Sequence, residues 1–137
     1  AKVNELADGT WEYASLRNST SMVSMSYGKT WQGVLFLGYV KNLGLADPVK
    51  TETIKASDVY FCSNGFSNLN QLFRINPQII YNIGKLNLGF EYQITSAQYG
   101  DYIKVDGVNH LNANALATEN LHWVTNHRLN MMIKFNF

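Results

Sequence analysis

The sequence predicts an all-β fold, an antiparallel meander of about six to eight strands. Three observations carry this prediction. Apolar and polar residues alternate over several segments of about ten residues, as they do on a strand with one apolar face. Charged residues make up 15% of the chain, below the ~25% of ordinary soluble domains. Short Gly-containing connections also alternate along the chain with long polar ones, which is typical of consecutive hairpins.

The composition narrows the class of protein. The chain has few charged residues and many uncharged Asn, Gln, Ser, Thr and Gly residues, and it contains eight Tyr, seven Phe and three Trp. This mixture is typical of β proteins with one uncharged polar face, such as the lumen side of β-barrels. No apolar run approaches the ~20 residues of a membrane-spanning helix. The net charge of +1 and the lack of a basic stripe argue against nucleic acid as a partner. Cys62 is the single cysteine, so an internal disulfide and a cysteine metal cluster are excluded.

The first third of the chain leads into two strands. Residues 1–8 are expected to be a loop or the tail of an earlier element, and residues 9–17 a strand, with a turn at 18–20. Alternation predicts the next strand at 20–28, followed by a tight connection. Residues 31–41 form another strand by length and composition, but they are apolar on both faces, so alternation does not choose the outer side.

The middle of the chain contains the clearest hairpin. A long connection at 42–69 is expected to include a short strand around 59–61. Strands at 70–82 and 85–97 then alternate almost perfectly across a short turn. Pro77 cannot donate a ladder hydrogen bond, so a bulge or a gap in pairing is expected there.

The last third ends on an apolar strand. Residues 98–120 form a long connection, and 102–105 and 108–111 are expected to pair as a small hairpin around Asp106-Gly107. The final strand follows from about Leu121. With the chain end placed in the periplasm, every short connection falls on one side and every long one on the other, the arrangement of outer-membrane barrels.

The final strand carries a recognisable ending. A polar residue at Asn130 precedes aromatic residues at the third-last and last positions, Phe135 and Phe137. This ending resembles the C-terminal targeting signal of Gram-negative outer-membrane β-barrels, although Met132 stands where those proteins usually carry glycine. The resemblance implies localisation in the cell outer membrane and recognition of this strand by the outer-membrane assembly machinery.

A second resemblance extends over residues 70–137. The segments FRINPQIIYNIGKLNLGFEYQITSAQYGD and NHRLNMMIKFNF are similar to the closing strands of Bacteroidetes-type outer-membrane porins, and resemble the DcaP-like family. The resemblance implies passive uptake of small hydrophilic solutes through a homotrimeric channel, with no cofactor. Because the strands of 1–137 are too few to close a barrel, we expect a single β-barrel segment whose remaining strands lie upstream.

This interpretation assigns a role to each strand face. Bulky apolar side chains are expected to face the lipid bilayer, with aromatic girdles at both interfaces, and the polar side chains to line the pore. The expected lipid-facing and girdle residues are Tyr81, Phe90, Tyr92, Trp123, Phe135 and Phe137. The expected lumen-lining residues are Arg74, Asn76, Gln78, Asn87, Glu91, Gln93, Arg128, Asn130 and Lys134.

The charges of the expected lumen favour anions. The expected lumen carries three cationic side chains, those of Arg74, Arg128 and Lys134, and one carboxylate, that of Glu91. This excess of positive charge favours anionic solutes. Two alternatives remain open. Lys134 lies near the chain end, where it can snorkel to the interface, and other strands can carry balancing acids.

Other function classes have less support. The three histidines, His110, His122 and His127, have no metal-ligand spacing, and no serine elbow is present, so neither a metal site nor an enzyme is expected. A soluble lipocalin-like barrel that binds an apolar ligand, or a small closed pore-less structural outer-membrane barrel, remains open. Soluble exteriors usually carry many Lys and Glu, whereas 85–97 offers only Glu91 beyond Lys85, which favours the membrane.

Overall fold

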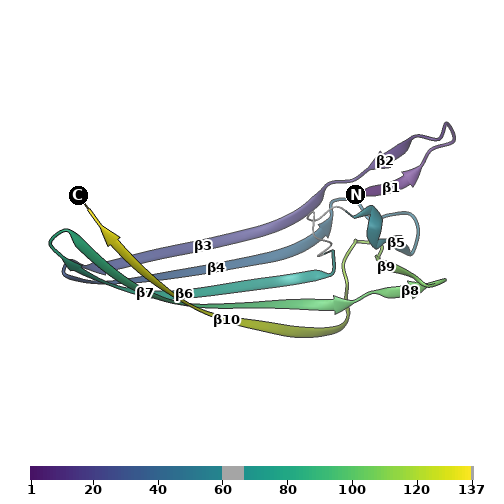
Figure 1. Ribbon diagram of the computed structural model, residues 1–137. Helices are drawn as coiled ribbons and strands as arrows, with labels where there is room; N and C mark the ends of the chain where they lie inside the picture. Colours follow the sequence, from purple (N-terminus) through teal and green to yellow (C-terminus); the bar gives the residue numbers. More distant parts are fainter. Residues whose placement is uncertain (60–66, 137) are drawn as a thin grey trace. The chain divides into compact units, whose positions relative to one another are not determined.

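The computed structural model describes residues 1–59 and 67–136, and it confirms an all-β antiparallel meander. Consecutive long strands lie beside one another in a five-stranded sheet of order β10-β7-β6-β4-β3, so that β3 and β10 form its edges (Figure 1). The apolar and polar alternation that predicted these strands is what a sheet with two different faces requires. Their bounds are β3 Leu16–Gly28, β4 Trp31–Leu45, β6 Leu69–Ile83, β7 Leu86–Asp101 and β10 Glu119–Phe135.

Shorter strands form two small sheets. One is the antiparallel pair of β1 and β2, and the other has the order β5-β9-β8. In the second sheet Ile103 pairs with His110 and Val105 with Val108, which confirms the small hairpin predicted around Asp106-Gly107. A single 3-10 turn, η1, follows β5. The bounds are β1 Lys2–Glu5, β2 Trp11–Tyr13, β5 Thr53–Lys55, η1 Ala56–Asp58, β8 Ile103–Val105 and β9 Val108–Asn112.

Two local predictions are wrong. The expected loop at 1–8 contains β1, which pairs with β2, and the expected turn at 18–20 lies inside β3. Asn and Ser favour turns locally, but pairing with β4 decides the conformation of 18–20, because sheet context overrides intrinsic preference. The predicted strand at 59–61 falls mostly outside the described residues, as do Cys62 and Phe137.

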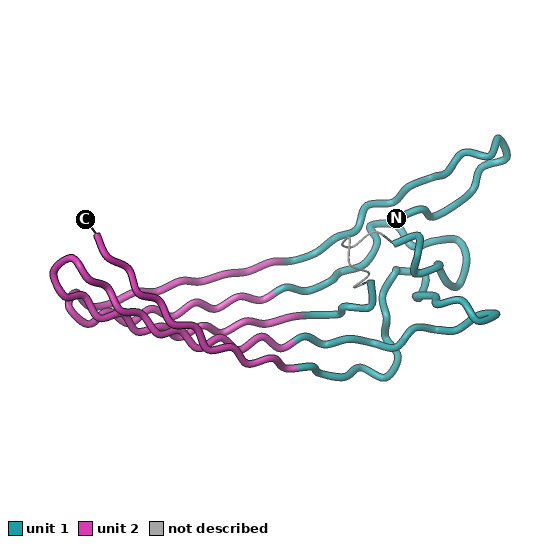
Figure 2. Tube along the Cα trace, in the orientation of Figure 1, with its two compact units in different colours: residues 1–19, 40–71, 97–124 teal, residues 20–39, 72–96, 125–137 magenta. Residues whose placement is uncertain are grey.

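The chain divides into two compact units (Figure 2). Unit 1 comprises residues 1–19, 40–71 and 97–124, and unit 2 comprises residues 20–39, 72–96 and 125–137. Each long strand contributes residues to both units. The short β3–β4 and β6–β7 turns belong to unit 2, whereas the long β4–β6 and β7–β10 connections belong to unit 1. These four connections of the main sheet therefore divide by length between the two units.

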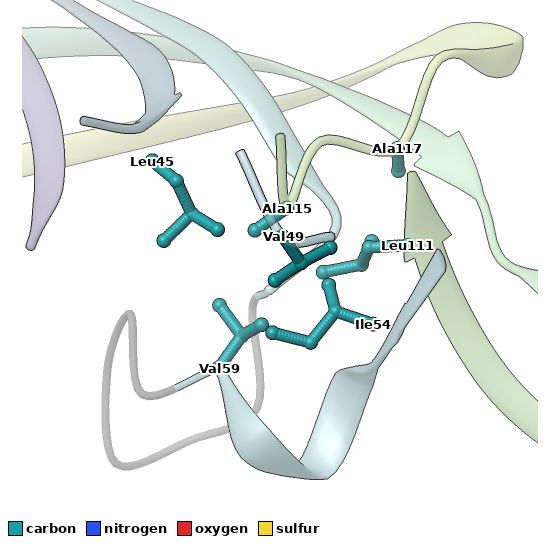
Figure 3. Packing of buried hydrophobic residues seen from close by; sticks show 7 residues of the cluster. All are labelled: Leu45, Val49, Ile54, Val59, Leu111, Ala115 and Ala117. Carbon is teal, nitrogen blue, oxygen red and sulfur yellow. The ribbon is translucent and has the colours of Figure 1, made fainter. Parts of the chain in front are cut away.

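Unit 1 has a buried hydrophobic core. Leu45 and Leu111 are almost completely buried, and they gather with smaller side chains from the long connections (Figure 3). Gly44 has a φ of +73°, and a Cβ there would lie 2.3 Å from the carbonyl oxygen of Asn114, so glycine is required for this close approach. The core cluster consists of Leu45, Val49, Ile54, Val59, Leu111, Ala115 and Ala117.

Unit 2 is built differently. Every buried hydrophobic residue in the described part of the chain belongs to unit 1, so the sheet of unit 2 has no comparable core. Within the described ranges, no helix is long and apolar enough to span a bilayer. The residues of unit 2 are therefore distributed between two exposed faces of one sheet rather than around a buried core.

Candidate functional site

The two faces of the unit 2 sheet can be assigned from contacts between neighbouring strands. Trp31 of β4 stacks on Tyr81 of β6 with ring centroids 4.2 Å apart, so the odd-numbered residues of both strands share one face. On the opposite face, a Cβ at Gly38 would lie 3.9 Å from the Cβ of Arg74. We call the first the apolar face and the second the amide face.

The apolar face exposes large hydrophobic side chains. Phe90 is 51% exposed, and its neighbour Ile79 on β6 is 47% exposed. Both line a shallow depression with Leu129 of β10, which is 75% exposed. Phe135, expected to face lipid, is 54% exposed. A continuous apolar surface of this kind is unusual on a protein surrounded by water.

Aromatic side chains lie at both ends of the unit 2 strands. The stacked pair of Trp31 and Tyr81 adjoins the short turns. Tyr92 lies further along β7, where its hydroxyl is 2.7 Å from Nδ1 of His127 and the two rings stack at 5.9 Å. Trp123, also expected in a girdle, is exposed but belongs to unit 1.

A chain of side-chain amides crosses the amide face near the short turns. Asn136 donates from Nδ2 to Oδ1 of Asn87 at 2.9 Å, and Asn87 donates to Oδ1 of Asn82. Asn82 in turn donates from Nδ2 to the carbonyl oxygen of Lys29 at 2.6 Å. This amide relay connects the end of the chain beyond β10 with β7, β6 and the β3–β4 turn. It therefore links the expected lumen residue Asn87 to partners that the sequence did not single out.

Further hydrogen bonds join neighbouring strands along the same face. Glu91 accepts a hydrogen bond from Nδ2 of Asn130 at 2.7 Å, which connects β7 with β10. Arg74 donates from Nε to Oγ1 of Thr95 at 3.1 Å, and Gln93 donates to the same oxygen at 3.1 Å. The structure therefore brings five of the expected lumen residues into hydrogen-bonded groups on one face.

The remaining expected lumen residues lie on the same face in other settings. Gln78 has its amide nitrogen 3.8 Å from the position of a Cβ at Gly89. The Oδ1 atom of Asn76 is buried and has no hydrogen-bond partner among residues 1–59 and 67–136. By strand alternation Arg128 and Lys134 share the face of Asn130, and both are exposed.

Several apolar side chains lie on the amide face. Alternation along the final strand places Met132 there, and it covers Gly89. The ring of Phe36 contacts the position of a Cβ at Gly38, in a segment whose faces the sequence did not assign. Val34 joins Phe36 by strand alternation. The two-residue turn after β3 sets Gly28 opposite Trp31, so both lie on the apolar face. Met25, an odd number of residues before Gly28, therefore lies on the amide face. The length of this turn was the sequence signal that could have assigned the faces of residues 31–41.

No protein-family model, curated protein or solved structure matches this chain. In the ranges that the structure describes, no group of three or more His, Cys, Asp or Glu side chains is arranged to hold a metal ion. The two faces of unit 2 are therefore the features of the described structure that bear on function.

Proposed function

We propose that this chain forms part of the wall of an outer-membrane, porin-like channel for passive uptake of small hydrophilic solutes. The apolar face of unit 2 would contact lipid, and the amide face would line the aqueous pore. The single observation that carries this proposal is the contrast between the faces. Large apolar side chains such as Phe90 and Leu129 are exposed on one, while amides and charged groups are hydrogen-bonded on the other.

Strand lengths support the proposal. The strand segments of unit 2 range from nine residues (31–39) to twelve (72–83). A tilted β-strand needs about 9–11 residues to cross the hydrocarbon layer. The stacked pair of Trp31 and Tyr81, next to the short turns, suits one interface, where amphipathic rings are favoured.

The residue pattern of β10 supports the proposed location. An alternating strand with Asn130 and Phe135 is the kind of segment that the outer-membrane assembly machinery recognises in the family that this chain resembles. The same resemblance to DcaP-like porins supports a homotrimer as the assembled form. Closure of the sheet into a barrel is part of the proposal, because a sheet edge within lipid leaves backbone groups unsatisfied.

Permeability of reconstituted vesicles tests the proposal. The complete gene product would be purified in detergent, inserted into liposomes, and assayed by swelling in isotonic solutions of uncharged solutes of increasing size. We expect swelling rates that fall with solute size, as diffusion through a water-filled pore requires. A protein that stays monodisperse in buffer without detergent and leaves vesicles impermeable would instead support a soluble barrel. Detergent dependence without permeability would support a pore-less structural barrel.

The charges of the amide face predict a preference for anions. Arg74, Arg128 and Lys134 outnumber Glu91 in the described part of this face, so the local potential should attract anions. We expect the double variant Arg74→Ala/Arg128→Ala to lower the chloride-to-potassium permeability ratio by about twofold. Reversal potentials across planar bilayers under a salt gradient measure this ratio.

The matched control removes a cation from unit 1. Lys104 is exposed on β8, and Lys104→Ala should leave the ratio unchanged if the face of unit 2 sets selectivity. A wild-type cation preference that the double variant does not alter would contradict the prediction.

A further inference from the structure

We propose that the amide face carries a subsite for ring-shaped solutes with one apolar face and a hydroxyl rim, the chemistry of a sugar ring. This inference rests on the proposed function and names a solute class for the same pore surface. It starts from an aromatic side chain, Phe36, on a face that is otherwise rich in amides.

Phe36 lies over a glycine that makes room for its ring. Its Cε1 and Cζ atoms are 3.1 and 3.3 Å from the position that a Cβ would occupy at Gly38. A side chain at Gly38 would push against the ring, so glycine allows the ring to lie close to the sheet. Glycine within a strand often marks such a close approach. The pair therefore places an aromatic ring on the amide face, and we call this ring and its apolar neighbours the platform.

Apolar neighbours extend the platform toward β3. Met25 and Val34 line a shallow hollow of about 290 Å³, and Gln78 lies at its border on β6. Val34 lies two residues before Phe36 on the same strand and faces the same side. The hollow is near the lower end of the size range of small-molecule pockets, about 300–1,000 Å³.

Hydrogen-bonding groups border the platform on the side of β6. Arg74 lies next to Gly38, and its guanidinium group has five N–H donors, of which Nε–H bonds to Thr95. Gln78 adds an amide with both donors and an acceptor.

An apolar platform next to hydrogen-bonding groups favours one class of solute over others. A small anion gains nothing from Phe36, Met25 and Val34, and a wholly apolar solute would strip water from Arg74 and Gln78 without replacing its hydrogen bonds. A sugar ring satisfies both requirements, because its C–H face can lie on the aromatic ring while its hydroxyl groups bond to amide and guanidinium groups.

Two solutes of similar size separate this effect from simple sieving. Glucose has a ring with an apolar face, whereas mannitol is an open-chain polyol. Efflux of each, radiolabelled, from vesicles containing the complete gene product would be measured. We expect glucose to cross about threefold faster than mannitol, within the range that one aromatic contact supplies. Phe36→Ala and Gly38→Val should both bring the ratio to about one, since the first removes the ring and the second displaces it.

Two control variants address folding and position. Phe36→Tyr keeps the aromatic platform and should keep the preference for glucose. Leu37→Ala changes a chain neighbour of Phe36 that lies on the apolar face, and should leave the ratio unchanged. Equal wild-type rates, or a ratio that survives Phe36→Ala, would overturn the sugar subsite while leaving the channel proposal intact. A protein that transports neither solute would overturn the channel proposal itself.

Discussion

Replacing Phe90 with arginine is expected to destabilise the membrane-inserted protein by about 2–4 kcal/mol, the cost of a cation on the lipid face near the middle of a bilayer. Phe90 lies in the unit 2 part of β7, and half of its side-chain surface is exposed on the apolar face. If lipid covers this face, the guanidinium group must be buried in hydrocarbon. Equilibrium unfolding in urea, with the protein inserted in vesicles of short-chain lipids, measures the loss.

The same charge on the other face provides the control. Gln93 lies three residues further along β7 and donates a hydrogen bond to Thr95 on the amide face. Gln93→Arg should change the free energy of unfolding by less than about 1 kcal/mol, because the added charge reaches water. Equal destabilisation by the two variants would contradict a lipid-facing side at Phe90.

Replacing Asn82 with leucine is expected to lower the free energy of unfolding by about 1–2 kcal/mol. Asn82 is the middle of the amide relay, since it accepts from Asn87 and donates to the carbonyl oxygen of Lys29 at 2.6 Å. A net hydrogen bond contributes about 0.5–1.5 kcal/mol, and water at the exposed end can replace part of the loss. The midpoint of urea unfolding in lipid vesicles measures this change.

Gln93→Leu is the matched control for this variant. It removes an amide of the same face whose hydrogen bond runs to Thr95 on its own strand and so ties no two strands together. We expect a smaller loss of stability than for Asn82→Leu. Losses of the same size in both variants would show that the relay adds nothing beyond the polarity of the individual side chains.

The sequence was most informative where alternation was strict. In β6 and β7, apolar residues such as Phe90 alternate with polar residues such as Glu91 almost without exception, so both the strands and their faces could be predicted. The observed contacts agree, with Glu91 bonded to Asn130 on one face and Phe90 exposed on the other. The short turns were predictable because they contain glycine between two clear strands.

Prediction failed where side chains of one kind occupy both faces or where pairing is distant. Residues 31–41 are apolar on both faces, so the turn before Trp31 and its stacking on Tyr81 are needed to assign their sides. The amide relay depends on Asn82 of β6, Asn87 of β7 and Asn136 beyond the end of β10, which meet only through the register of the sheet. The small strand β5 pairs with β9 across more than fifty residues, a contact that local patterns do not encode.

The strand order of the main sheet has a geometric consequence. Neighbouring strands run in opposite directions, and five is an odd number, so the edge strands β3 and β10 point the same way. They cannot join each other as antiparallel partners. A ring in which all neighbours oppose one another has an even total, so any such ring containing these five strands must contain an odd number of others. If the sheet closes in this way, a count of the strands in the complete ring should therefore give an even number.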